Sequence, residues 1–181
     1  PWGAGFAPFS NMILTLNAME TRSNALYLKL EKPFTSASNW GTTIAYTYTD
    51  SEQNSPVDGW PGAFNAKSIE DYGWFPGKVP KHRLVTTGIY DGPWGMTFSG
   101  KLTLASATPR YYQNCNGTAW AYCHFDAYTP DDDFKQFDVA LSKEWDTGTS
   151  LKYRVRADVL NVFNWANYSG YDDWRGGANE P

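Results

Sequence analysis

The residues best suited to hold a ligand are aromatic, and they gather in two segments rich in Gly, Pro, Asn and Asp. Flat ring faces with polar tips suit sugars, aromatic chelates or peptides. Packing of the rings against each other within these segments is the other interpretation of the same pattern. The candidates are Trp60, Tyr72, Trp74 and Phe75 in the first segment, and Tyr111, Tyr112, Trp120, Tyr122 and His124 in the second.

Two cysteines, Cys115 and Cys123, lie in the second of these segments and are the only ones in the chain. Metal sites usually need closer pairs or further ligands, and the only histidines are His82 and His124. We therefore expect a loop disulfide, with two free thiols as the alternative. The acidic run 131–133 is either a solvated cluster or a weak site for a hard cation.

No nucleophile, acid pair or phosphate-binding loop stands out, so we expect neither an enzyme nor a bound cofactor or metal. The 181 residues carry 15 Lys and Arg against 19 Asp and Glu, without a basic run, which argues against a nucleic-acid partner. No apolar stretch is long enough for a membrane-spanning helix. This observation does not exclude a membrane barrel, because the strands of such barrels show only alternating hydrophobicity. Aromatic residues make up 17% of the chain.

Alternation with a period of two predicts the strands, most clearly over residues 151–163. Six of the seven odd positions there are apolar, whereas the even positions begin with Lys152, Arg154, Arg156 and Asp158. Residues 135–145 alternate in the same way, and a short turn at 146–150 joins the two segments. Arg154 and Arg156 should therefore share a polar face, where they pair with neighbouring strands or contact substrate.

Two further hairpins follow the same pattern, at 82–91 with 94–105 and at 24–32 with 40–49. The sequence thus predicts an all-β fold of six strands in three hairpins. Their short turns alternate with long segments at about 50–81 and 106–134. Short turns on one side and long loops on the other are typical of an antiparallel up-and-down transmembrane β-barrel.

Aromatic residues also occur at the predicted strand ends, which is where membrane barrels place them. Beside the short turns are Phe34, Trp40, Trp94 and Trp145, and at the opposite ends are Tyr48 and Phe163. Large rings flank turns in soluble β-proteins too, so this feature favours a membrane interface without requiring one.

The segment 156–168 contains Asn161-Val-Phe-Asn164 followed by Asn167-Tyr168. This phrase after a charged alternating strand resembles a late barrel strand of TonB-dependent outer-membrane receptors. The stretches 79–85 and 101–111 resemble the strand entry and exit of the Oar-like branch of that family.

This resemblance implies that residues 1–181 form about six strands of a roughly 22-strand barrel, without the plug domain and final strand. It implies energy-coupled uptake of a scarce nutrient, such as a siderophore, vitamin, oligosaccharide or peptide, across the outer membrane of a Gram-negative bacterium. Its partners would be outer-membrane lipid, the protein's own plug domain and the TonB energy-transducing complex. The alternative is a soluble β-sandwich that binds carbohydrate. Transport predicts lipid-facing side chains, and a sandwich predicts a buried core, at Leu26, Leu28, Leu30, Met96, Phe98, Val155 and Val159.

Overall fold

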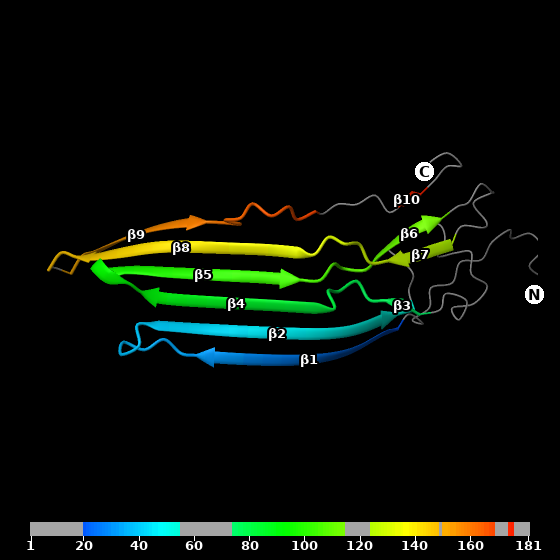
Figure 1. Cartoon of the computed structure of the whole chain (residues 1–181), viewed down its shortest axis with the longest axis horizontal. Helices are drawn as coiled ribbons and strands as arrows, with labels where there is room; N and C mark the ends of the chain where they lie inside the picture. Colours follow the sequence, from blue (N-terminus) through cyan, green and yellow to red (C-terminus); the bar gives the residue numbers. More distant parts are fainter. Residues whose placement is uncertain (1–19, 55–73, 115–123, 149, 169–173, 176–181) are drawn as a thin grey trace, which may run out of the picture.

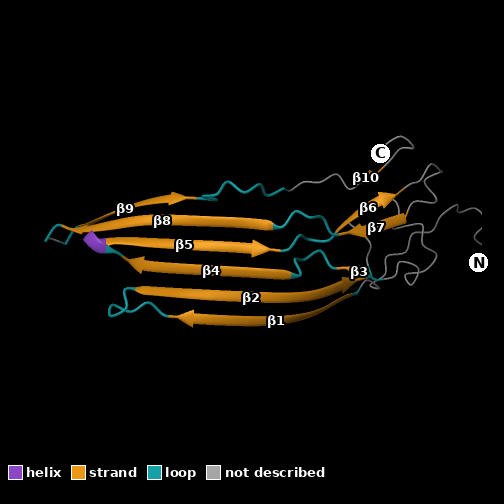
Figure 2. Cartoon of the chain, viewed as in Figure 1, coloured by secondary structure: helices purple, strands orange, loops and turns teal. Residues whose placement is uncertain are grey.

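The computed structural model describes residues 20–54, 74–114, 124–148, 150–168 and 174–175. These residues form an all-β structure with one 3-10 turn at Pro93–Gly95 (Figure 2). The strands are β1 (Thr21–Lys32), β2 (Trp40–Gln53), β3 (Phe75–Pro76), β4 (His82–Asp91), β5 (Met96–Ala105), β6 (Arg110–Asn114), β7 (His124–Tyr128), β8 (Phe134–Asp146), β9 (Lys152–Val159) and β10 (Trp174–Arg175). The predicted fold class is therefore confirmed at the level of an all-β chain.

The main sheet has the strand order β1-β2-β4-β5-β8-β9, with β3 added to the end of β2. Every pairing in this sheet is antiparallel. The three predicted hairpins are all present, and their short turns lie together at one end of the sheet (Figure 1). Strands β3, β6, β7 and β10 lie at the other end, where β10, β6 and β7 form a second, three-stranded sheet. The two ends of the main sheet therefore differ.

One face of this sheet is apolar and the other is polar. The register runs through the six long strands without a shift, so alternate residues of neighbouring strands line up in rows. One such row is Leu30, Ile44, Thr86, Leu102 and Phe137. The row next to it on the opposite face is Lys29, Ala45, Val85, Thr103 and Gln136.

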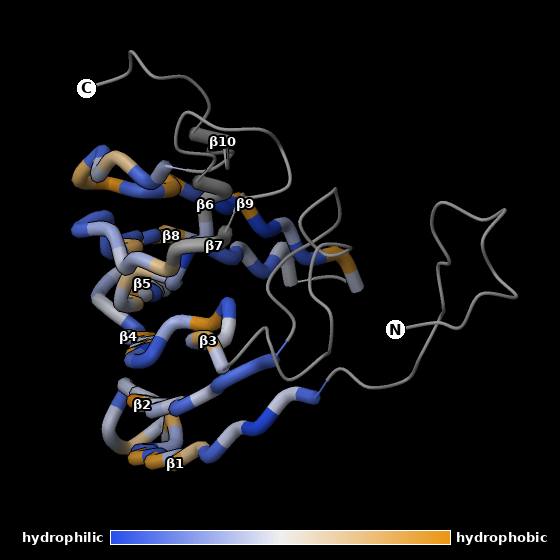
Figure 3. Tube along the Cα trace, turned by 90° about the vertical axis from the view of Figure 1, so that its right-hand side faces the viewer, coloured by the Kyte–Doolittle hydropathy of each residue, from blue (hydrophilic) through white to orange (hydrophobic). Residues whose placement is uncertain are grey.

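Neither face is covered by a second layer among the described residues. Figure 3, which looks along the strands, shows the six long strands in a single layer. Buried hydrophobic residues in this part of the chain are limited to Ala107, Tyr111 and Ala140. By contrast, Leu30 is 67% exposed and Val155 is 61% exposed. The apolar side chains thus form an exposed face, and the described strands do not enclose a core.

The segment 106–134 is more ordered than its composition predicts. Instead of an irregular loop it contains the antiparallel pair β6 and β7, and β10 adds to β6 in parallel. Asp133 accepts a hydrogen bond from the Ala107 backbone N–H at 2.9 Å, and Asp132 pairs with Arg110. Two residues of the acidic run therefore have structural partners, which the sequence pattern could not reveal because the partners lie more than twenty positions away.

The strand predicted over 151–163 is wrong at its end, because β9 stops at Val159. Asn161 and Asn164 have φ angles of 50° and 52°. Asparagine tolerates this left-handed conformation better than most residues, and it turns the chain out of the strand. Phe163 then stacks on Phe137 with ring centroids 5.6 Å apart. The phrase 161–164 is thus a turn that brings a ring back onto the sheet.

Replacing Gly41 by alanine is expected to destabilise the protein by about 1–2 kcal/mol. A Cβ atom at Gly41 would lie 2.6 Å from the backbone N of Phe34, in the turn that joins β1 to β2. The matched control is Gly88→Ala, where the nearest atom would be 4.0 Å away. Denaturant unfolding of the intact protein measures both, and equal effects would contradict the steric explanation.

Candidate functional site

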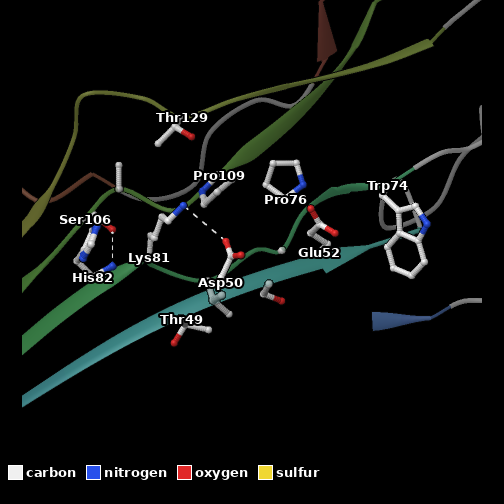
Figure 4. A pocket seen from close by; sticks show the side chains of 14 residues that line it. Thr49, Asp50, Glu52, Trp74, Pro76, Lys81, His82, Ser106, Pro109 and Thr129 are labelled. Carbon is white, nitrogen blue, oxygen red and sulfur yellow. Dashed lines mark hydrogen bonds and ion pairs between the residues drawn. The ribbon is translucent and has the colours of Figure 1, made fainter. Parts of the chain in front are cut away.

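A cavity of about 400 Å³ lies at the end of the sheet opposite the short turns. It is bounded by the ends of β2 and β4, by the segment 74–81 and by the residues that follow β5. Figure 4 shows the side chains that line it. Those with polar or aromatic groups are Thr49, Asp50, Ser51, Glu52, Trp74, Lys81, His82, Ser106 and Thr129.

Backbone hydrogen bonds hold the segment 74–81 along β2. The Gly77 N–H donates to the Ser51 carbonyl at 2.6 Å, and the Thr49 N–H donates to the Lys81 carbonyl at 2.9 Å. A Cβ atom at position 77 would lie 2.3 Å from the Ser51 hydroxyl oxygen, so this close approach requires glycine. The wall of the cavity is therefore fixed by the backbone of both segments.

The cavity carries two carboxylates with different partners. Asp50 forms an ion pair with Lys81 at 3.6 Å, which Figure 4 shows as a dashed line. Glu52 points between Pro76 and Trp74 in the same view. It forms no ion pair within the described part of the chain. Its side chain is therefore available to accept hydrogen bonds from a ligand.

Trp74 provides the aromatic surface of the cavity and is 39% exposed. The Arg22 guanidinium lies 3.8 Å from the centre of its indole ring, which holds the ring in place by a cation–π contact. Trp74 is the one predicted ligand-binding residue that the structure places in this cavity with its side chain described.

His82 is held by β2 and by the chain after β5. Its ring Nδ1 lies 2.8 Å from the Tyr46 hydroxyl, and its backbone N–H donates to the Ser106 hydroxyl at 3.0 Å. The Ser106 hydroxyl thus contacts the His82 backbone and not the imidazole. Among the described residues, this geometry positions His82 as part of the wall and does not pair it with a serine nucleophile.

Tyr111 does not line the cavity, although the sequence suggested it as a ligand contact. It is 2% exposed, and its ring packs edge-on against Phe75 at 5.8 Å. The Lys78 ammonium lies 5.7 Å from the ring centre. Burial raises the pKa of the Tyr111 phenol above its usual value. We conclude that Tyr111 packs β6 against the segment 74–81.

Arg154 and Arg156 lie on the polar face of β9, away from the cavity. Arg154 forms an ion pair with Glu144 at 2.6 Å, and Arg156 pairs with Asp158 at 2.7 Å. Lys152 lies 3.5 Å from the same Glu144. Arg154 thus pairs with a neighbouring strand, as predicted, whereas Arg156 pairs within β9. The structure brings neither of them together with Trp74.

Several predicted residues lie outside the described ranges, namely Trp60, Tyr72, Trp120, Tyr122, Cys115 and Cys123. Tyr112 and His124 are described only through the backbone of β6 and β7, where Tyr112 pairs with Asp126 and His124 with Asn114. Sequence reasoning missed Asp50, Glu52, Lys81 and His82. Their signal was a group of charged residues immediately flanking two predicted strands.

Comparisons with protein-family models, with curated proteins and with solved structures found no match to this chain. No helix among the described residues is long and apolar enough to cross a membrane. The same residues contain no group of three or more His, Cys, Asp or Glu side chains placed to hold a metal ion. We therefore infer the function from the geometry of the sheet and of the cavity.

Proposed function

We propose that this chain forms late barrel strands of a TonB-dependent receptor, which imports a scarce nutrient across the outer membrane of a Gram-negative bacterium. The main support is the exposed apolar face that runs across six antiparallel strands. Soluble proteins rarely leave so large an apolar surface open to water. Lipid would cover this face, and further strands would pair with the outer edges of β1 and β9.

The dimensions of the sheet support this placement. The ten-residue strand β5, at about 3.3 Å per residue and tilted by about 45°, covers roughly 23 Å of a membrane. The apolar band of outer-membrane barrels is about 25 Å tall and is flanked by aromatic rings. On the apolar face, Trp40, Tyr90 and Trp145 lie toward the short turns, and Tyr46 and Tyr48 lie toward the other end.

The polar face suits the inside of such a barrel. It carries the ion pairs of β9 together with hydroxyl groups such as those of Thr43, Thr47 and Thr103. In the receptor it would face the plug domain, and transport would need the TonB energy-transducing complex. These partners follow from the resemblance in 101–111 and 156–168, and the polarity of this face is consistent with them.

A labelling experiment tests the orientation. The test uses the intact protein with Cys115 and Cys123 replaced by serine. Thr129→Cys then introduces a cysteine at the cavity end, and Ser150→Cys introduces one at a short turn. A membrane-impermeant maleimide added to whole cells is expected to label position 129. Position 150 should react only after the outer membrane is permeabilised. Equal labelling of both positions in intact cells would contradict the proposal.

The cavity at the outer end is where we propose that the nutrient is first held. Trp74 offers a ring, and Glu52, Asp50 and Thr49 offer oxygen acceptors, a combination that suits a hydroxyl-rich ligand such as an oligosaccharide.

Trp74→Ala is expected to reduce uptake about ten-fold at low nutrient concentration. This corresponds to a loss of about 1.4 kcal/mol of binding free energy, which is typical of a residue in a binding interface. The matched control is Trp94→Ala, at a short turn on the opposite end, where the ring is 78% exposed. Growth on a panel of oligosaccharides as the limiting nutrient measures both variants. Equal uptake by the two variants on every sugar would remove Trp74 from the binding site.

A further inference from the structure

A hollow lies in the middle of the apolar face, where two strand glycines are opposite each other. Gly88 of β4 pairs with Gly100 of β5, and a cavity of about 610 Å³ lies over them. Large side chains wall it on both sides, and these are Trp40, Tyr90, Phe98, Leu102 and Phe137. The lining is therefore almost entirely apolar, and the hollow is separate from the cavity around Trp74.

The backbone does not require these glycines. Neither has a positive φ, and the register passes through the pair without a bulge. A Cβ atom at Gly88 would meet nothing closer than the Gly41 carbonyl oxygen at 4.0 Å, and one at Gly100 would contact the Phe137 ring at 3.5 Å. Glycine inside a strand costs stability and often marks close approach of a ligand. The space over the pair is thus available to a molecule outside the chain.

A cation lies on the same face, toward the short turns. In β8, Lys143 lies opposite Met96 of β5. Leu141, two positions earlier in β8, lies opposite Phe98. The Lys143 ammonium lies 5.1 Å from the Trp145 ring and forms no ion pair within the described part of the chain. Lys32 lies on this face as well, but its ammonium donates to the Ser38 hydroxyl and to the Trp40 carbonyl, each at 2.8 Å. Lys143 is therefore the better placed of the two to meet an anion.

We propose that the hollow holds one acyl chain of an anionic phospholipid, whose phosphate lies at Lys143. An apolar groove with a cation near one end matches a molecule with an apolar tail and an anionic head. Val139 lies opposite Gly100, Leu141 lies one row farther and Lys143 two rows farther, so the cation is about 14 Å along the strand from the glycine pair. This inference rests on the proposed function, because it requires the apolar face to lie in a bilayer.

The test uses the intact protein in phosphatidylcholine vesicles that contain phosphatidylglycerol with a dibromostearoyl chain, which quenches nearby tryptophans. Trp40 lines the hollow and reports its occupancy. We expect saturable quenching with about five-fold preference for dibromo-phosphatidylglycerol over dibromo-phosphatidylcholine. Gly88→Leu should remove this component by filling the hollow. Ala157→Leu, on the same face outside the hollow, should retain it. Lys143→Gln should abolish the preference.

The outcomes separate this proposal from the one on which it rests. Absence of quenching by either lipid would overturn the membrane placement itself. Equal quenching of wild type and Gly88→Leu would overturn only the lipid site, as would a five-fold preference that survives in Lys143→Gln. If Gly88→Leu altered the oligomeric state without changing quenching, the hollow would belong to a contact between two copies of the protein. Should Gly88→Leu fail to insert, the Lys143→Gln result decides.

Discussion

Leu102→Arg is expected to destabilise the intact protein in a bilayer by about 2–4 kcal/mol, the cost of a cation on the lipid face near mid-membrane. Leu102 lies in β5, opposite Thr86 of β4 and Phe137 of β8. This row lies within the apolar face, between the row of Trp40 and Tyr90 and the rows of Tyr46 and Tyr48. An arginine here would have neither water nor a carboxylate partner unless it displaced lipid.

The matched control is Thr103→Arg, on the polar face of the same strand, where we expect a change of less than about 1 kcal/mol. Urea unfolding in phospholipid vesicles, followed by tryptophan fluorescence, measures both variants. Arginine at Leu102 would also destabilise a soluble sandwich. The stability of a sandwich, however, would be the same with and without lipid. Full stability of wild type in the absence of lipid or detergent would therefore count against the membrane placement.

Val155 is a weaker position for the same test, although the sequence pattern made it an obvious choice. The register places Val155 opposite Lys143, one row from Trp145 and Tyr153 at the short turns. Arginine near such a boundary reaches water and costs only about 0–1 kcal/mol. The contrast between Leu102→Arg and Val155→Arg thus measures depth in the membrane, and equal costs would contradict the register.

Asn161→Ala is expected to destabilise the protein by about 2–3 kcal/mol. About 1 kcal/mol or more arises because alanine disfavours the left-handed backbone found there, with φ at 50°. The remainder is the loss of two hydrogen bonds with Trp165, one to its carbonyl at 2.9 Å and one from its N–H at 3.2 Å. These bonds hold the turn that places Phe163 on Phe137.

Asn161→Gly separates the two contributions, because glycine accepts the left-handed conformation but has no side chain. We expect it to lose about half as much stability as Asn161→Ala, measured by the urea midpoint of the intact protein. The backbone N–H of Asn161 would still donate to Asp138, at 2.9 Å in the structure. A glycine variant as unstable as the alanine variant would show that backbone conformation contributes little.

Local patterns were sufficient to predict the strands and poor at predicting what lies between them. The three hairpins follow from alternation and turn residues, both of which are properties of neighbouring positions. The pair β6 and β7 was missed because a segment rich in Gly, Asn and aromatics gives no clean alternation. The end of β9 was missed because Val159 and Phe163 keep the apolar odd positions of the strand, whereas Asn161 between them turns the backbone out of it.

The candidate sites show the same division. Trp74 was named from composition, but Glu52 lies in another segment and lines the same cavity only because β3 pairs with β2. The hollow over Gly88 and Gly100 likewise exists only because the register sets two isolated glycines side by side.

The sequence by itself determined which residues alternate, and hence that the chain forms amphipathic antiparallel strands with short turns at one end. Alternation is local, since successive side chains in a strand point to opposite faces whatever its neighbours are. The tertiary structure alone decided which strands adjoin and at what register, and so which residues share a row, a cavity or a membrane depth. Those relations depend on hydrogen bonds between positions far apart in the chain, and a one-residue shift in pairing would have placed Leu102 and Lys143 among different neighbours.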